Sequence, residues 1–272
     1  MDINSIDWKE AWGCYQHVRR AADNASYWNE RAKSFANHAG TSPYAREFME
    51  RAKVKEGETI LDMGCGSGAL AIPMALAGHD VYACDFSTAM LGIVEEAAHA
   101  NGVADKIHTK LVSWADDWDE LDVPVCDVAF ASRSMAADDL WAAIVKLDSR
   151  ARRRVCVTMG TNQSPRIDPV LRAAIGRTTP GQPEFVYAMN MLWAMGKRPE
   201  LSNIISLRQD FFENKEDAVE KYAQILEATP EETERLRAYV EEHMHQVQTD
   251  DGMRWKFDHE RTTNWAFISW EK

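Results

Sequence analysis

Residues 58–90, ETILDMGCGSGALAIPMALAGHDVYACDFSTAM, form the stretch of sequence around which the rest of the chain is organised. The stretch opens with a β-branched and apolar run, residues 59–63, which predicts a buried strand. The strand breaks into a loop at Gly64, Gly66 and Gly68, because glycines at alternate positions let the backbone turn sharply and bring its amides against a ligand. The Ala-rich segment that follows is expected to start a helix whose N-terminus faces that ligand.

A second predicted strand, residues 79–84, ends at Asp85, which lies 21 positions after Gly64. A carboxylate at this spacing can accept the hydroxyl groups of a ribose. Dinucleotide-binding sequences share this acid, but their GxGxxG loop receives a pyrophosphate, whereas the loop here reads GCGSGA and follows Asp62. An acid two residues before the first glycine repels a phosphate and suits an ammonium group. An NAD-dependent oxidoreductase is therefore the disfavoured alternative.

The pair DMGCGSG (62–68) and ACDFSTAML (83–91) resembles motifs one and two of class I S-adenosylmethionine-dependent methyltransferases, with similarity over residues 58–160. The resemblance implies S-adenosylmethionine as cofactor and S-adenosylhomocysteine as product. It assigns the methionine end to Asp62 and the backbone of Gly64 to Gly66, and the ribose to Asp85. The resemblance also places Ser113 and Trp114 beside the adenine, with Asp116 as the alternative to this pair. The further residues that it places in the cofactor pocket are Cys65, Gly68, Phe86, Met90, Ser113, Trp114 and Ser132.

The segment YWNERA, residues 27–32, lies in an N-terminal region whose aromatic residues repeat at helical spacing. In related methyltransferases a segment like this closes over the cofactor, so the resemblance points to Tyr27, Trp28 and Arg31 as lid residues. The alternative is that Trp28 only packs a helix on the sheet.

Predicted strands alternate with predicted helices along the chain, which favours an α/β, doubly wound sheet with its ligands at the carboxyl ends of the strands. We expect a Rossmann-like seven-stranded sheet that is mostly parallel, with an antiparallel last strand over residues 262–270. The expected organisation is one methyltransferase domain over residues 1–272. It divides into a helical lid (1–55), a cofactor-binding core (56–160), and substrate-side helices and strands (161–272), including a helix over residues 230–247.

The composition excludes several classes of function. A formal net charge of −12 disfavours binding to nucleic acid, and the basic run at residues 150–154 is expected to be a solvated edge of the sheet. Five cysteines without CxxC spacing are typical of reduced thiols in a cytoplasmic protein. No leader or long apolar run is present, so neither secretion nor a membrane span is expected. Homo-oligomer formation remains open.

Methyl transfer from a sulfonium needs alignment and exclusion of water more than a fixed catalytic residue. The sequence therefore indicates a small-molecule methyltransferase while leaving open whether an O, N, S or C atom accepts the methyl. A non-catalytic S-adenosylmethionine-binding module is a second alternative. The positions that end the fourth and fifth strands, 131–132 and 161–162, carry no acids, so no metal is expected.

Arg133 follows the fourth predicted strand, where this fold brings side chains close to the transferred methyl. A guanidinium there can hold a carboxylate or phosphate of the acceptor in a bidentate manner. The alternative is an ion pair with Asp138 or Asp139 at the start of the next helix.

Overall fold

The computed structural model describes residues 6–19, 25–32, 42–135, 137–161, 167–177 and 183–272. The chain divides into two units, of which the first comprises residues 1–159, 184–204 and 266–272 and the second comprises residues 160–183 and 205–265. The expectation of one methyltransferase domain over residues 1–272 stays a prediction.

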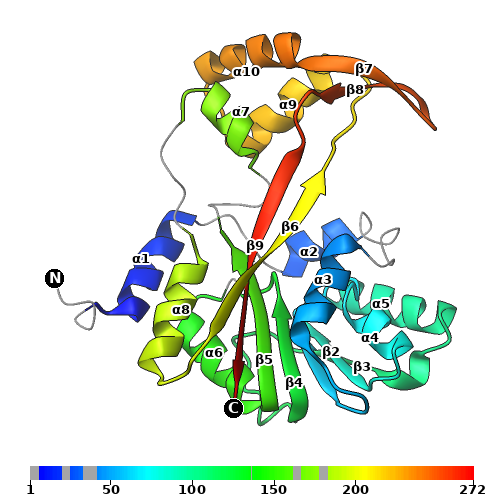
Figure 1. The fold of residues 1–272 in the computed structure, drawn as a ribbon, viewed down its shortest axis with the longest axis vertical. Helices are drawn as coiled ribbons and strands as arrows, with labels where there is room; N and C mark the ends of the chain where they lie inside the picture. Colours follow the sequence, from blue (N-terminus) through cyan, green and yellow to red (C-terminus); the bar gives the residue numbers. More distant parts are fainter. Residues whose placement is uncertain (1–5, 20–24, 33–41, 136, 162–166, 178–182) are drawn as a thin grey trace. The chain divides into compact units, whose positions relative to one another are not determined.

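A seven-stranded sheet in the order β3-β2-β1-β4-β5-β9-β6 runs through the first unit, and β6 and β9 also contribute residues to the second. Strand β1 pairs in parallel with β2 and β4, whereas β9 runs antiparallel (Figure 1). This confirms the predicted sheet. Its strands are β1 Ile60–Met63, β2 Val81–Asp85, β3 Ile107–Leu111, β4 Cys126–Ser132, β5 Ala151–Gly160, β6 Glu200–Arg208 and β9 Arg261–Glu271.

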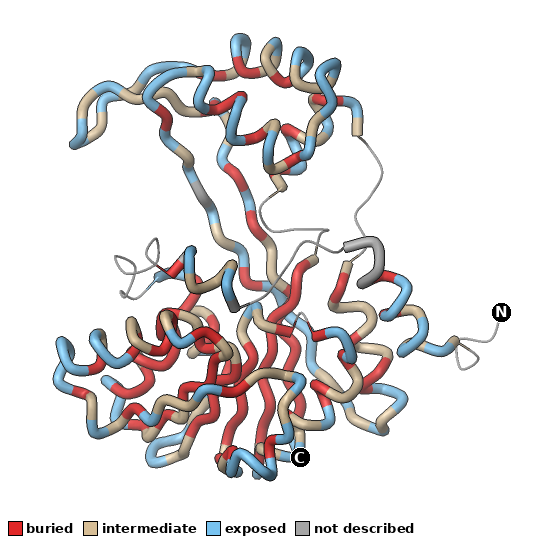
Figure 2. The backbone as a smooth tube through the Cα atoms, turned by 180° about the vertical axis from the view of Figure 1, so that it is seen from behind, coloured by how far each residue is buried: buried red, intermediate tan, exposed pale blue. Residues whose placement is uncertain are grey.

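Helices cover both faces of this sheet, with α3, α4 and α5 on one face and α1, α6 and α8 on the other (Figure 1). Buried residues follow the central strands, and exposed residues lie on the outer sides of the helices (Figure 2). The helices of the first unit are α1 Trp8–Arg19, α2 Ala25–Ala32, α3 Pro43–Ala52, α4 Ala71–Leu76, α5 Thr88–Ala100, α6 Leu140–Ser149 and α8 Phe185–Ala194.

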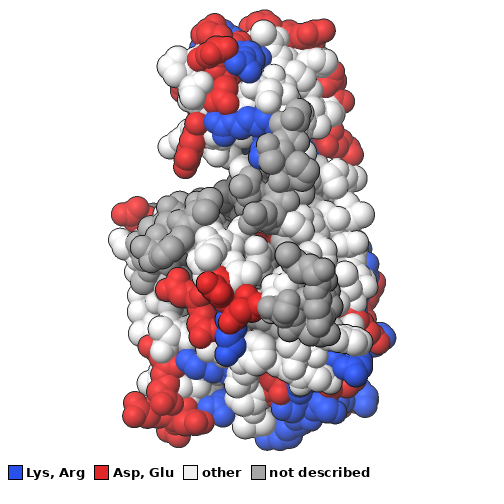
Figure 3. Space-filling model, turned by 90° about the vertical axis from the view of Figure 1, so that its left-hand side faces the viewer, with Lys and Arg blue, Asp and Glu red and all other residues white. Residues whose placement is uncertain are grey.

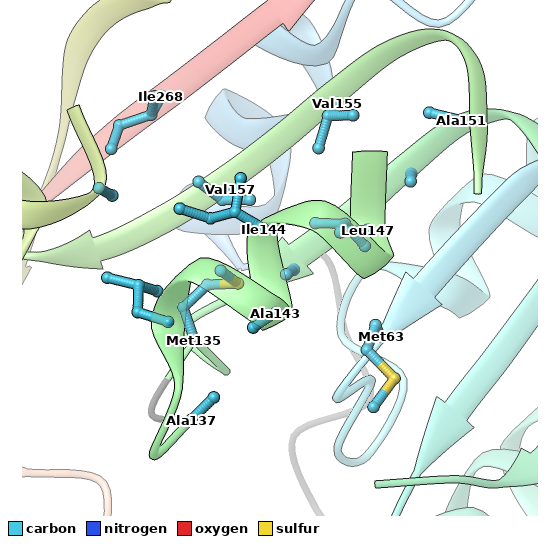
Figure 4. Packing of buried hydrophobic residues seen from close by; sticks show 14 of the residues in the cluster. Met63, Met135, Ala137, Ala143, Ile144, Leu147, Ala151, Val155, Val157 and Ile268 are labelled. Atoms are coloured by element: carbon cyan, nitrogen blue, oxygen red, sulfur yellow. The ribbon is translucent and has the colours of Figure 1, made fainter. Parts of the chain in front are cut away.

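Strand β4 packs differently on its two sides because successive side chains of a strand point to opposite faces. Ala129 and Ala131 belong to the buried cluster that includes Ile144 of α6, and part of this cluster is drawn in Figure 4. Phe130 contacts Phe48 of α3 with ring centroids 5.0 Å apart. Small side chains on one side and large ones on the other thus seat a layer of helices on each face.

Helix α4 begins only at Ala71, so Pro73 lies in its first turn. A proline is tolerated there because the first four amides of a helix have no intrahelical partner. Because the helix starts late, residues 64–70 form a long loop of turns between β1 and α4. This loop is the part of the fold that faces the site.

The second unit has its own buried core, which includes Tyr222, Leu236 and Phe257. The predicted helix over residues 230–247 is wrong at its end, because α10 stops at His243 and the chain continues as a β-hairpin. Buried Met244 pairs with Phe257 across the hairpin, which draws the chain into a strand. The elements are α7 Pro169–Ala174, α9 Lys215–Leu226, α10 Pro230–His243, β7 Met244–Thr249 and β8 Gly252–Phe257.

Across both units, none of the helices in the described residues has the length and apolar character needed to cross a bilayer.

Candidate active site

The loop after β1 is bound to the end of β2 through its backbone. The amides of Gly64 and Cys65 both donate to the carbonyl of Cys84, at 2.7 and 3.0 Å. Gly64 has a φ of +72°, and a Cβ built on it would lie 2.3 Å from the Cβ of Ser134. Glycine is therefore required here for packing, independently of any ligand, because real side chains do not approach so closely.

Gly66 differs from Gly64 because its missing side chain faces open space. Its φ is +54°, and a Cβ built on it would meet no atom of the described residues within 4 Å. Its amide donates to Oδ2 of Asp85 at 2.9 Å, and the amide of Gly68 donates to the carbonyl of Cys65 at 3.0 Å. The loop thus holds a bare stretch of backbone beside the acid that ends β2, as a ligand-binding loop would.

Asp85 is buried at the end of β2. Burial raises the pKa of its carboxyl group, and hydrogen bonds from the amides of Ser87, Gly66 and Phe86 oppose this effect. A carboxylate offers about four acceptor positions, so capacity remains for a ligand hydroxyl. The adjoining Phe86 is half-buried, and the hydroxyl of Ser87 caps α5 by accepting from the amide of Met90 at 3.1 Å.

Asp62, the acid that precedes the glycine loop, is only 2% exposed. Its Oδ1 atom has no hydrogen-bond partner among the described residues. Burial, together with the charge of Asp85, raises the pKa of Asp62 to about 7, while the charge of Arg133 lowers it. A buried carboxylate with an unpartnered oxygen is costly unless a ligand supplies a donor or a positive charge. The site is thus suited to a cationic group.

Helix α2 contributes a residue that the sequence did not single out. Oδ1 of Asn29 accepts from the hydroxyl of Ser87 at 2.6 Å, which ties α2 to the start of α5. Tyr27 and Trp28 are half-buried and make an edge-to-face contact with centroids 5.5 Å apart. The side chain of Arg31 lies outside the described residues. A lid role for this segment stays a prediction.

The segment after β3 is a tight turn that is fixed by several hydrogen bonds. The amide of Ser113 donates to Oδ2 of Asp116 at 2.7 Å, so that carboxylate serves the turn itself. The indole of Trp114 donates to the carbonyl of Ser134 at 2.8 Å, and Nζ of Lys146 donates to the carbonyl of Trp114 at 2.8 Å. Trp114 is thereby held towards the loop after β4. Adenine binding by Ser113 and Trp114 stays a prediction.

Tyr44 of α3 is a second residue missed from the sequence. Its hydroxyl contacts Ser132 at the end of β4 and Thr158 in β5. The adjacent Arg133 is exposed, and Asp139 caps α6 by accepting from the amide of Ala142 at 2.9 Å. Whether Arg133 binds an acceptor or pairs with an acid of α6 stays a prediction. Within the described part of the chain, no group of three or more His, Cys, Asp or Glu side chains has an arrangement suited to a metal.

The glycine loop and the two buried acids lie in a part of the chain that matches a known family. Residues 60–151, which include the glycine loop, the two buried acids and strands β1 to β4, match the methyltransferase domain family. Over these residues the chain carries a methyltransferase domain, in agreement with the class I S-adenosylmethionine-dependent family predicted from the sequence. The predicted family is thereby confirmed.

Two relatives align with this methyltransferase domain and its surroundings. An uncharacterized protein of Haemophilus influenzae is 37% identical over 179 residues, which are 65% of each chain. Ribosomal protein L11 methyltransferase of Bacillus pumilus is 26% identical over 128 residues, which are 40% of this chain and 41% of that enzyme. The chain thus spans less than two thirds of the length of either relative.

A solved structure agrees with the fold of the methyltransferase domain. A candidate methyltransferase of Bacillus halodurans superposes with a TM-score of 0.53 and 12% sequence identity. The superposition covers 84% of this chain and 98% of that one. At this identity the likeness bears on the fold alone.

Proposed function

We propose that this chain is an enzyme that binds S-adenosylmethionine at the carboxyl ends of β1 and β2. It transfers the methyl group to a small-molecule acceptor without a metal ion and leaves S-adenosylhomocysteine. The observation that carries this proposal is Asp62, a buried acid beside the glycine loop with an unpartnered oxygen. The ammonium group of the methionine end supplies both the donor and the positive charge that this oxygen lacks.

The same observation argues against a dinucleotide. A pyrophosphate bound beside Asp62 and Asp85 would face two buried carboxylates, and like charges at short range repel each other strongly in a buried site. An NAD-dependent oxidoreductase therefore remains the disfavoured alternative.

The residues of the pocket act by positioning and by excluding water. Asp62 holds the ammonium group, the backbone at Gly66 lies against the ligand, and Asp85 accepts from a ribose hydroxyl. When bound, S-adenosylmethionine supplies a methyl group on a cationic sulfur, which an acceptor displaces in line. Fixing the cofactor at both ends removes much of the entropic cost of that alignment.

The basic run after α6 supports a small acceptor over a nucleic acid. Arg150 pairs with Asp119, Arg152 with Asp127, Arg153 with Glu58, and Arg154 with Glu271. On the face shown in Figure 3, Lys and Arg gather in clusters, with clusters of Asp and Glu beside several of them. Arginines that are neutralised in this way offer little to a phosphate backbone, which takes its affinity from such charges. A protein acceptor is the competing reading, since the Bacillus pumilus relative acts by name on a ribosomal protein.

The affinity for S-adenosylhomocysteine should rise with pH. The pKa of Asp62 is about 7 in the free protein, so below that pH the ammonium group meets a neutral acid. We expect affinity to increase between about pH 5.5 and 7.5 by up to roughly tenfold per pH unit and then level off. Calorimetry on the wild type and on Asp62→Asn checks this, because the variant should bind weakly at every pH. If the affinity of Asp62→Asn still rises steeply with pH, Asp62 does not hold the ammonium group.

The opposite sign holds for the stability of the free protein. The pKa of Asp62 is raised from 3.8 to about 7 on folding. The stabilisation from this group is therefore complete below its unfolded pKa and is lost as pH rises through its folded pKa. Bound ligand should restore stability at neutral pH, because the ammonium group then compensates the charge.

Label transfer tests the function. The protein is incubated with methyl-labelled S-adenosylmethionine, in buffer containing EDTA, together with a cell extract separated into small-molecule, RNA and protein fractions. We expect the label to appear in the small-molecule fraction. Label confined to protein or RNA would contradict the acceptor class, and turnover only after Mg²⁺ replaces EDTA would contradict metal independence. Binding without transfer to any fraction would favour a non-catalytic module.

A further inference from the structure

A hydrogen-bonded cluster joins α3 to the ends of β4 and β5, beside the cofactor pocket proposed above. The buried hydroxyl of Tyr44 lies 2.7 Å from the hydroxyl of Ser132 and 2.6 Å from that of Thr158. The guanidinium of Arg133 lies over the ring of Tyr44, with Cζ 4.2 Å from the ring centroid. Three elements of the first unit thus meet at one arginine.

The backbone of Arg133 is fixed by the same cluster. Its φ of +59° lies in the left-handed region, which residues other than glycine rarely adopt. The conformation is held because its amide donates to the carbonyl of Thr158 at 3.2 Å and to the hydroxyl of Thr158 at 3.0 Å. Strained conformations of this kind persist only where the surroundings hold them, and they cluster at active sites and ligand clamps.

The position of Arg133 matters because of the acids around it. Asp62 and Asp85 are both buried at the carboxyl ends of β1 and β2, and the charge of Arg133 acts on Asp62. Such a pocket repels any anionic ligand group unless a fixed cation offsets the acids. A guanidinium that already rests on a ring loses less freedom on binding than a lysine would, and its planar fork matches a carboxylate.

Building on the proposed function, we infer that Arg133, positioned by Tyr44 and Thr158, is the carboxylate-binding residue of this pocket. The carboxylate belongs either to the methyl acceptor or to the methionine end of the cofactor, whose ammonium group Asp62 holds. Both sources present the same planar oxyanion to the guanidinium. Tyr44 acts through Arg133 and is a positioning residue.

The first arm of the experiment asks about the cofactor's carboxylate. Calorimetry compares S-adenosylhomocysteine with its analogue that lacks the carboxylate, on wild type, Arg133→Gln, Arg133→Lys and Tyr44→Phe. If the cofactor supplies the carboxylate, Arg133→Gln should weaken S-adenosylhomocysteine at least about tenfold and leave the analogue within about twofold. Tyr44→Phe should shift the same ratio by a smaller factor, which a purely structural role would not do. The matched control is Arg46→Gln, because Arg46 is an exposed arginine on α3, the helix that carries Tyr44. This variant should leave both affinities unchanged.

The second arm asks about the acceptor. Label transfer from methyl-labelled S-adenosylmethionine is measured with a panel of small carboxylic acids and with their primary amides. If the acceptor supplies the carboxylate, Arg133→Gln binds S-adenosylhomocysteine normally, the wild type labels acids and not amides, and Arg133→Lys loses at least about tenfold of that labelling.

The inference is overturned if Arg133→Gln binds S-adenosylhomocysteine like the wild type and the wild type labels acids and amides alike, or neither. Thermal unfolding of each variant separates loss of binding from loss of fold. If the wild type fails to bind S-adenosylhomocysteine at all, the proposed function fails instead, so the two failures are distinguishable.

Discussion

Gly66→Ala should fold and yet lose roughly 100-fold in affinity for S-adenosylhomocysteine, which corresponds to about 3 kcal/mol. The reason is steric. A Cβ at this position meets none of the described residues within 4 Å, so the folded protein has room for it, but it would occupy the space in which the ligand lies against the loop. Calorimetry measures the loss, and thermal unfolding shows that the protein remains folded.

Gly102→Ala is the matched control. Gly102, in the turn after α5, also has a positive φ, +68°, and open space among the described residues where a Cβ would stand. Both variants carry the same left-handed strain of about 1–2 kcal/mol, and only one of them borders the proposed cofactor. Equal affinities of the two variants for S-adenosylhomocysteine would place the ligand elsewhere. Gly64→Ala is a poorer probe, because its Cβ would collide with Ser134 and disturb the fold itself.

Asp85→Ala should weaken S-adenosylhomocysteine by about 1.5–3 kcal/mol, or roughly 10- to 150-fold, because hydrogen bonds to a charged acceptor are worth about that much. The carboxylate fixes the loop through the amide of Gly66 and the start of α5 through the amide of Ser87. Its removal therefore costs both a ribose contact and the order of the loop. Calorimetry on the folded variant provides the measurement.

Asp127→Ala serves as the control for this second variant. Asp127, at the start of β4, likewise accepts from a neighbouring backbone, with the amide of Thr59 at 2.9 Å, but it lies at the opposite end of the strands from the loop. We expect a modest loss of stability, about 1 kcal/mol, and no change in ligand affinity. If Asp85→Ala binds as well as Asp127→Ala, Asp85 does not hold the ribose.

The sheet could be predicted from the sequence because its signals are local. The predicted last strand, residues 262–270, differs from Arg261–Glu271 by one residue at each end. Alternating apolar residues and glycine breaks mark strand ends without reference to the rest of the fold. The doubly wound, mostly parallel arrangement followed from the alternation of strands with helices.

The β7–β8 hairpin could not be predicted in the same way. Val240 and Val247 continue a helical spacing, so the sequence extends the helix past its true end at His243. What stops the helix is the pairing of Met244 with Phe257. The turn signal, Asp250, Asp251 and Gly252, was present in the sequence and marks the hairpin in retrospect.

The candidate site, like the fold, could be predicted from the sequence only where its signals are local. Asp62, the glycine loop and Asp85 lie within one continuous stretch, so their spacing alone indicates a pocket. Tyr44 and Thr158 are 114 positions apart, and only the parallel register of β4 with β5 and the placement of α3 bring them to Arg133. Asn29 escaped notice for the same reason, since nothing in its own sequence points to α5.

A direct titration with two cofactors tests the central claim most simply. S-adenosylhomocysteine and NADH are each titrated into the wild-type protein, with calorimetry for the first and nicotinamide fluorescence for the second. The prediction is saturable binding of S-adenosylhomocysteine at one site per chain, weakened roughly 100-fold in Gly66→Ala, and no binding of NADH. Saturable binding of NADH without binding of S-adenosylhomocysteine would contradict it.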